Sequence, residues 1–247
     1  MRESTLDVLV SDLHIKQINF EISNNSLKES TIEFFEEIIK YVPVVETRRG
    51  MYYRGRIIGL YDGADKGVLW KNNIPVTGYD IENSGIAPKN CIVKRGRINQ
   101  VNEQVLYIAE DERTAIYEVT KENQQDYISL ASCLIEHPIN VIDFSAINEE
   151  KFKELFPKEM RTKFSEQFGM SWLKIYVQMQ MYLSSEEYAE NDYLIPLKLI
   201  ELIKKNKDLS GIQYASSYTM KSNIALWDEN VFLKCDNSIV THHTEWI

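Results

Sequence analysis

Residues 105–119, VLYIAEDERTAIYEV, contain one example of each kind of element from which we expect this chain to fold. Val105 to Ala109 is a short apolar run, which predicts a buried strand. Asp111 has a side chain that commonly caps helices. Residues 111–119 have their apolar side chains at the spacing of one helical face, which predicts a short helix. Glu118 then lies in the last turn of the predicted helix, next to the sheet.

Outward from this stretch, the sequence continues as short strands with one block of helices between them. Apolar and β-branched runs predict strands at residues 128–134, 139–144, 212–214 and 224–227. Three-to-four spacing of apolar residues predicts helices in residues 149–183, with an interruption at Gly169, and in residues 196–205. Strands before and after a helical block are typical of an α+β fold and not of an alternating α/β fold.

The first fifty residues form a separate stretch ahead of these elements. Ser30 and Glu33 have the spacing of a capping box, and an amphipathic helical pattern follows until Pro43 ends it. We expect residues 1–50 to be a helical extension that packs either on one main domain, residues 51–247, or on a partner.

The charge pattern restricts the kind of ligand. A formal net charge of −9 would repel a phosphate backbone, which argues against nucleic-acid binding through a broad basic face. Six of the nine arginines nonetheless fall within residues 48–56 and 95–97. Arginine can hold a phosphate with two parallel hydrogen bonds, so the clusters indicate either a small anionic ligand or a balance of nearby acidic surface. Charge alone does not separate these two interpretations.

Cysteine usage and hydropathy bear on the compartment. Cys91, Cys133 and Cys235 are far apart and odd in number, which suggests neither a disulfide framework nor a paired-cysteine zinc site. Charged residues interrupt the first twenty positions, and no apolar run reaches the length of about 18 residues that a membrane span needs. We therefore expect a cytoplasmic protein with no membrane association.

Common catalytic motifs are absent from the sequence. It has no glycine-rich phosphate loop, no dinucleotide-binding glycine fingerprint and no His-Glu-x-x-His helix. His242 and His243 are adjacent. Because they lie near the end of the sequence, a frayed polar tail is a simpler interpretation than a metal site. We expect no bound metal and no serine–histidine chemistry.

A series of short motifs, in order, resembles the RES-domain family. In the middle of the chain, RGRIN at 95–99, VLYIA at 105–109 and TAIYEV at 114–119 resemble the family's Gly-Arg-x-Asn, Leu-Tyr-x-Ala and Thr-Ala-x-x-Glu. Further matches are YRGR at 53–56, GIAP at 85–88, YL at 193–194 with Glu201, GIQYASS at 211–217 and NIALW at 223–227. Two departures concern the wall of the expected pocket: Ala215 stands where the family usually has Pro, and the Thr-Gln expected near Pro196 is missing.

The resemblance implies a fold and an activity. The fold would be similar to that of ADP-ribosyltransferases, with a mixed or antiparallel β core, an inserted helical layer and residues 51–247 as the catalytic domain. The activity would be removal of nicotinamide from NAD, often by the toxin of a bacterial toxin–antitoxin pair. The residues expected at the catalytic centre are Arg97, Tyr107, Glu118 and Ser216, and those expected to bind substrate are Arg54, Arg56, Asn99 and Asn223.

These residue types suit that chemistry. Nicotinamide is cationic in NAD and leaves neutral, so cleavage needs no general acid, unlike ordinary glycoside hydrolysis. Arginine forks would hold the pyrophosphate and Tyr107 would contact the nicotinamide. Glu118 would bind the ribose hydroxyls and stabilise the developing positive charge. Ser216 would hydrogen-bond the ligand or orient Glu118; it is not expected to be a nucleophile, since no base partner is evident.

Several alternatives stay open at this level. NAD is expected as substrate, with water or inorganic phosphate as the group that attacks the sugar, in a toxin or anti-phage effector. A mono-ADP-ribosyltransferase would share the donor site and differ in its acceptor. An NAD- or antitoxin-binding module without turnover is the alternative from another class. An antitoxin protein and a second copy of the chain are the expected partners.

Overall fold

The computed structural model describes residues 21, 27–60, 70–71, 74–75, 78–93, 95–120, 126–146, 149–168, 171–184, 194–206, 208–231, 233–236 and 239–242, and the structural statements below concern these residues. Expectations for residues 1–20, Gly169, Tyr193 and His243 lie outside the described residues.

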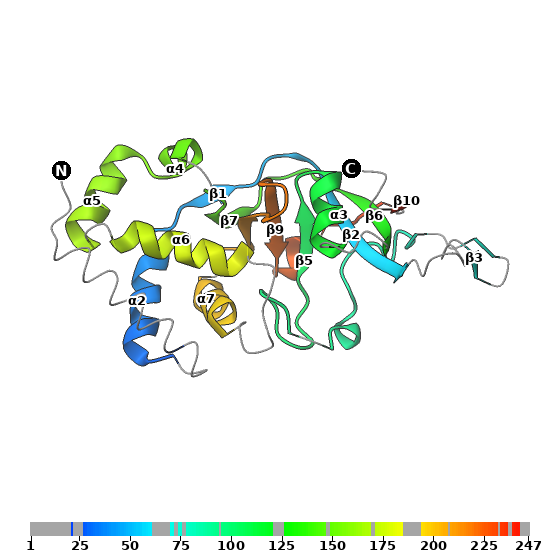
Figure 1. Ribbon diagram of the computed structural model, residues 1–247, viewed down its shortest axis with the longest axis horizontal. Coiled ribbons are helices and arrows are strands. Elements are labelled where there is room, and N and C mark those ends of the chain that lie inside the picture. Colours follow the sequence, from blue (N-terminus) through cyan, green and yellow to red (C-terminus); the bar gives the residue numbers. More distant parts are fainter. Residues whose placement is uncertain are drawn as a thin grey trace.

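One mixed sheet forms the centre of the fold, with strands in the order β1-β7-β8-β9-β5-β2-β6-β10 (Figure 1). Its strands are β1 (Val44–Glu46), β2 (Gly50–Leu60), β5 (Leu106–Ala109), β6 (Asp126–Ile135), β7 (Asn140–Phe144), β8 (Gly211–Ala215), β9 (Ser222–Leu226) and β10 (Ile239–His242). A separate pair consists of β3 (Trp70–Lys71) and β4 (Ile74–Pro75). Of the pairings described in the large sheet, β7 with β8 is parallel and the others are antiparallel.

The helical block explains the parallel pair, because parallel neighbours need a long crossover connection. Among the described residues, four helices lie along the chain between β7 and β8. The helices are α2 (Glu29–Ile39), α3 (Glu112–Thr120), α4 (Glu149–Leu155), α5 (Lys158–Phe168), α6 (Ser171–Ser184) and α7 (Leu194–Lys204), and short 3₁₀ turns occur at η2 (Lys89–Cys91) and η3 (Glu229–Val231). The predicted α+β fold with an inserted helical layer is confirmed.

The two faces of the sheet have different covers, since neighbouring strand residues point to opposite sides. Ile142 packs with side chains of α2, α6 and α7 in one core cluster. Val141, the preceding residue, packs in a second cluster with Tyr52 and Leu226. In Figure 1 the helices α2 and α4–α7 gather at one end of the molecule, and α3 lies at the other end beside β2 and β6. α3 covers the same face as α2, α6 and α7, because Ala115 and Ile116 pack with Ala109, which points to the same side of β5 as Tyr107 in the first cluster.

Helix α2 and the strand after it are attached to the main domain. Phe35, Ile38 and Val42 belong to the same core cluster as α6 and α7. β1 pairs antiparallel with β7, so that Val44 lies opposite Ile142. The part of the expected extension that the structure describes therefore contributes to the common core and to the edge of the sheet.

The predicted capping box at the start of α2 is wrong. The helix begins at Glu29, and its N-cap, Lys28, makes no side-chain capping bond. The buried carboxylate of Glu21 instead accepts hydrogen bonds from the Lys28 backbone N–H at 3.0 Å and from the Thr31 hydroxyl at 2.7 Å. A carboxylate from outside the helix thus satisfies groups near its first turn, which local spacing could not indicate.

The start of α3 agrees with the sequence, whereas the C-terminal tail does not. The Asp111 carboxylate accepts a hydrogen bond from the Thr114 N–H at 2.7 Å, which confirms the predicted cap. His242, which was expected together with His243 to belong to a frayed tail, is the last residue of β10, and β10 pairs with β6 so that Ile239 lies opposite Leu130. The pairing partner lies more than a hundred residues earlier in the sequence, so tail composition alone was a poor guide.

The cysteine prediction also needs correction, because Cys133 and Cys235 form a disulfide. Cys133 lies on β6, and Cys235 makes an isolated antiparallel bridge with it just before β10. Strand pairing brings together two residues that are 102 positions apart in sequence. Cys91 is free and exposed. The expectation of a cytoplasmic protein, which rested in part on unpaired cysteines, loses that support.

Thiol counting tests this bond. Denatured, unreduced protein is expected to have one reactive thiol per chain, from Cys91, and three after reduction. Reduction is expected to lower the free energy of unfolding by about 2–4 kcal/mol, since the bond closes a long loop. A Cys91→Ser variant should have no reactive thiol before reduction and unchanged stability. Three reactive thiols in the unreduced wild type would show that the bond does not form.

None of the helices within the described ranges combines the length and apolar character needed to cross a lipid bilayer.

Candidate active site

A cavity of about 340 Å³ opens on the helix-covered face of the sheet, where α3 and the central strands meet. Six of the eight predicted site residues line it: Arg54, Arg97, Asn99, Tyr107, Glu118 and Asn223. They come from β2, the loop before β5, β5 itself, α3 and β9. The three strands among these are distant in sequence but neighbours in the sheet. Its volume lies within the usual range of about 300–1,000 Å³ for small-molecule sites.

Close packing of α3 on β2 sets the position of Glu118. A Cβ atom at Gly55 would lie 2.5 Å from the Ala115 carbonyl oxygen and 3.1 Å from Val119 Cγ2. Only a residue without a side chain lets the helix approach the strand this closely. Gly55 therefore determines how near the last turn of α3, with Glu118, lies to the sheet.

We expect Gly55→Ala to lower the free energy of unfolding by about 1–3 kcal/mol, because the helix must move away from the strand. Thermal unfolding measures this effect. Gly85→Ala is the matched control, since the nearest atom to a Cβ there is the Leu233 carbonyl oxygen at 3.7 Å, an ordinary contact. Equal stability of the two variants would contradict the proposed role of Gly55.

Glu118 is held in place by Asn223. The Asn223 side-chain amide donates to Glu118 Oε1 at 2.7 Å. Asn223 is itself buried on β9, so its amide is a fixed donor. Among the described residues, Glu118 Oε2 has no hydrogen-bond partner. The site thus presents one oriented carboxylate oxygen to a ligand.

Two arginines border the cavity from different elements. Arg54 Nη1 donates to the Ser84 carbonyl oxygen at 3.0 Å, and Arg97 Nη1 donates to the Leu183 carbonyl oxygen at 2.8 Å. Burial and the neighbouring Arg56 lower the pKa of Arg54 to about 9, so its guanidinium stays charged at neutral pH. These bonds fix one end of each guanidinium at the wall, an arrangement suited to an anionic ligand.

Tyr107 and Asn99 form a bonded pair at the same wall. The Tyr107 hydroxyl donates to Asn99 Oδ1 at 2.9 Å. Burial raises the pKa of Tyr107 well above its usual value, so the hydroxyl stays protonated. A Cβ at Gly96 would lie 2.5 Å from Asn99 Oδ1, so this glycine allows the loop to carry Asn99 over Tyr107.

The structure places Ser216 and Arg56 outside the lining of this cavity. Ser216 follows the end of β8, and its hydroxyl oxygen accepts hydrogen bonds from the N–H groups of Tyr218 and Thr219 at 3.2 and 3.4 Å. It therefore stabilises a turn. Arg56 Nη1 donates to the Asn83 carbonyl oxygen, and its guanidinium lies 4.8 Å from the Tyr79 ring centre.

Tyr214 lines the cavity and was not among the predicted residues. It lies on β8 directly opposite Asn223 on β9. Burial and the nearby Glu118 carboxylate raise the pKa of Tyr214. Its position two residues before Ser216 was a usable signal, since strand residues i and i+2 point to the same face.

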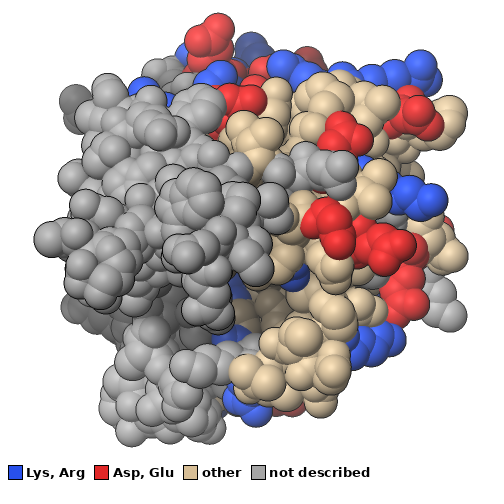
Figure 2. Space-filling model, turned by 90° about the vertical axis from the view of Figure 1, so that its right-hand side faces the viewer, with Lys and Arg blue, Asp and Glu red and all other residues tan. Residues whose placement is uncertain are grey.

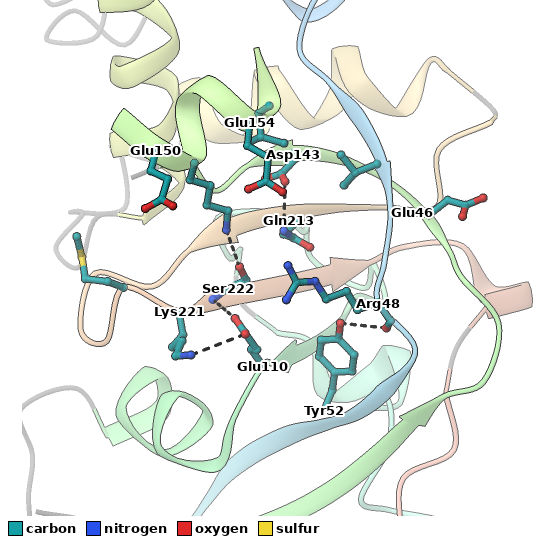
Figure 3. A pocket seen from close by; sticks show the side chains of 14 residues that line it. Glu46, Arg48, Tyr52, Glu110, Asp143, Glu150, Glu154, Gln213, Lys221 and Ser222 are labelled. Carbon is teal, nitrogen blue, oxygen red and sulfur yellow. Dashed lines mark hydrogen bonds and ion pairs between the residues drawn. The ribbon is translucent and has the colours of Figure 1, made fainter. Parts of the chain in front are cut away.

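A second cavity, of about 460 Å³, opens on the opposite face of the sheet (Figure 3). Gln213 and Ser222 line it, whereas their neighbours Tyr214 and Asn223 line the first cavity, as strand alternation requires. In Figure 3, Glu154 of α4 and Arg48 lie on different sides of it. Its charged lining consists of Glu46, Glu110, Asp143, Glu150, Glu154, Arg48, Lys151 and Lys221. Acidic groups outnumber basic ones, which makes this cavity less suitable for a pyrophosphate.

The charges at the β2 and α3 end of the molecule are also unevenly spread. Figure 2 shows Asp and Glu side chains gathered over the described part of this face, and Lys or Arg side chains in a hollow below them.

Within the described ranges, no cluster of three or more His, Cys, Asp or Glu side chains could hold a metal ion.

No protein-family model matches this chain, and neither does any curated protein. Among solved structures, the chain is similar to the crystal structure of the M. tuberculosis MbcT–MbcA toxin–antitoxin complex, with 10% sequence identity and a TM-score of 0.42. The match covers 86% of this chain and 94% of the other.

Proposed function

We propose that this protein consumes NAD by cleaving the bond between nicotinamide and ribose. The observation that carries the proposal is the oriented carboxylate of Glu118, which lies in one cavity with Arg54, Arg97 and Tyr107. Arg97, Tyr107 and Glu118 are three of the four residues that the RES-domain resemblance assigns to the catalytic centre, and Arg54 is one of those it assigns to substrate binding. The resemblance suggests the activity, and the shared cavity supports it.

The reaction would proceed by departure of nicotinamide from the sugar. The bond between ribose C1′ and the pyridinium nitrogen breaks, and its electron pair neutralises the nitrogen. Water then adds to C1′ and loses a proton, which gives ADP-ribose; inorganic phosphate would instead give the 1-phosphate. Glu118 stabilises the positive charge that develops on the sugar, a contribution of about 3–4 kcal/mol for a preorganised group. No general acid is needed, because the leaving group departs neutral.

The other residues would bind and orient the substrate. Arg54 and Arg97 would pair with the pyrophosphate through charge-assisted hydrogen bonds. Tyr107, kept neutral by burial, would offer its ring to the nicotinamide. Asn223 would act through Glu118 and not on the substrate. Asn99 would act through Tyr107, whose hydroxyl it accepts.

An enzyme of this kind would harm the cell that makes it unless its activity were controlled. We infer a toxin or anti-phage effector that acts on the cytoplasmic NAD pool and is held inactive by an antitoxin protein. Because disulfides are rare in the cytoplasm, the thiol count of the protein isolated from cells bears on this location.

Release of free nicotinamide from NAD tests the proposal. Purified protein is expected to release nicotinamide, and comparison with and without inorganic phosphate identifies the attacking group. Label from NAD on a protein would favour ADP-ribose transfer. Binding of NAD with no product would favour a non-catalytic module. Absence of both binding and release would reject the proposal.

A further inference from the structure

The hydroxyl of Tyr214 is an unused donor at the candidate active site. Tyr214 is only 5% exposed, yet it lines the cavity. Among the described residues its hydroxyl has no hydrogen-bond partner. By contrast, the Tyr107 hydroxyl is bonded to Asn99. The residue is buried but its hydroxyl oxygen is accessible from the cavity, so a group bound in the cavity can accept a hydrogen bond from it.

An unused acceptor lies next to this donor. Tyr214 faces Asn223 in the register of β8 and β9, and directly opposite residues have Cβ atoms about 4.5–5.5 Å apart. Asn223 holds Glu118 Oε1, which leaves Oε2 available. Tyr214 and Glu118 both line this cavity, and the Glu118 charge contributes to the raised pKa of Tyr214. The cavity thus presents a neutral donor, Tyr214, and a carboxylate acceptor, Glu118, on either side of Asn223 in the contacts described.

A group that both accepts and donates through one atom would satisfy both of them. A sugar hydroxyl does so, because its oxygen can accept from Tyr214 while its hydrogen is donated to Glu118. We propose that Tyr214 is a substrate-binding residue that reads the 2′-hydroxyl of the ribose next to the cleaved bond, together with Glu118. The inference rests on the proposed function and extends it: the substrate must carry a ribose, and not a deoxyribose, at this position.

A comparison of two substrates and two variants tests this role. The substrates are NAD and its analogue that lacks the 2′-hydroxyl on the nicotinamide ribose. Tyr214→Phe removes the donor and keeps the ring. Tyr52→Phe is the matched control, since Tyr52 is also buried on the sheet but lines the cavity on the opposite face.

Tyr214→Phe is expected to lower kcat/KM for NAD by about 10-fold, the value of one hydrogen bond beside a charged group. It should leave kcat/KM for the deoxy analogue almost unchanged, so that the preference for NAD falls by the same factor. The ratio between enzymes cancels the different intrinsic reactivity of the two substrates. Tyr52→Phe should change neither rate. An equal loss for both substrates in Tyr214→Phe would overturn the assignment.

Equilibrium binding separates failure of this inference from failure of the proposed function. If the wild type releases no nicotinamide but binds NAD, calorimetry on the same variants and substrates should show the same loss of preference. If NAD is cleaved and Tyr214→Phe behaves as wild type, the inference alone is wrong. If NAD is neither bound nor cleaved, both are wrong. Unchanged unfolding temperatures verify that the variants are folded.

Discussion

Replacement of Glu118 by glutamine is expected to slow nicotinamide release from NAD by about 10²–10³-fold, while the affinity for NAD changes only a few-fold. The glutamine keeps the size of the side chain and an oxygen that can accept from Asn223, whose amide donates to Glu118 at 2.7 Å. What is lost is the negative charge beside the sugar. Loss of this charge destabilises the transition state and not the bound substrate. We therefore expect kcat to fall and KM to stay almost the same.

Single-turnover release of nicotinamide measures this effect, and Glu154→Gln is its matched control. Glu154 lines the cavity on the opposite face, so its charge is not expected to matter. A loss of less than 10-fold in Glu118→Gln, or an equal loss in both variants, would contradict the assigned role of Glu118.

Replacement of Arg97 by lysine is expected to raise KM for NAD by about 10–100-fold with a smaller change in kcat. Arg97 is fixed at the cavity wall by its bond to the Leu183 carbonyl oxygen at 2.8 Å. A guanidinium can hold that carbonyl and a phosphate at once, whereas an ammonium lacks the planar fork for both. Keeping the positive charge makes the substitution a test of geometry.

Arg48→Lys is the matched control for Arg97→Lys. Arg48 belongs to the second cavity and is expected to tolerate the change. Initial rates over a range of NAD concentrations give both constants. If Arg48→Lys raises KM and Arg97→Lys does not, the pyrophosphate binds on the opposite face of the sheet and the proposed site is misplaced.

Local sequence patterns predicted much of the fold. The strand and helix of residues 105–119 appear with the Asp111 cap in place, and the helical block lies between β7 and β8. Such features depend on neighbours in the sequence, which periodicity and capping preferences describe well. The motifs also led to six residues that share one cavity, although these come from five separate segments.

The misses depend on contacts between distant parts of the chain. Glu21 bonds the Lys28 N–H and the Thr31 hydroxyl at the start of α2, and Cys133 meets Cys235 only because their segments pair. Ser216 shows that the end of a strand, too, is hard to predict from a local pattern. Strand alternation would place it on the same face as Tyr214, but β8 ends at Ala215 and the Ser216 hydroxyl turns into the following loop. One residue of strand length thus decides which of these two side chains lines the cavity.

A crystal structure of the Glu118→Gln variant with NAD tests the central claim most directly, because the slowed reaction should leave the substrate intact. We predict that the ribose next to nicotinamide lies within hydrogen-bonding distance of residue 118, with the pyrophosphate on Arg54 and Arg97. NAD bound instead in the cavity beside Arg48, or a first cavity left empty at saturating NAD, would contradict it.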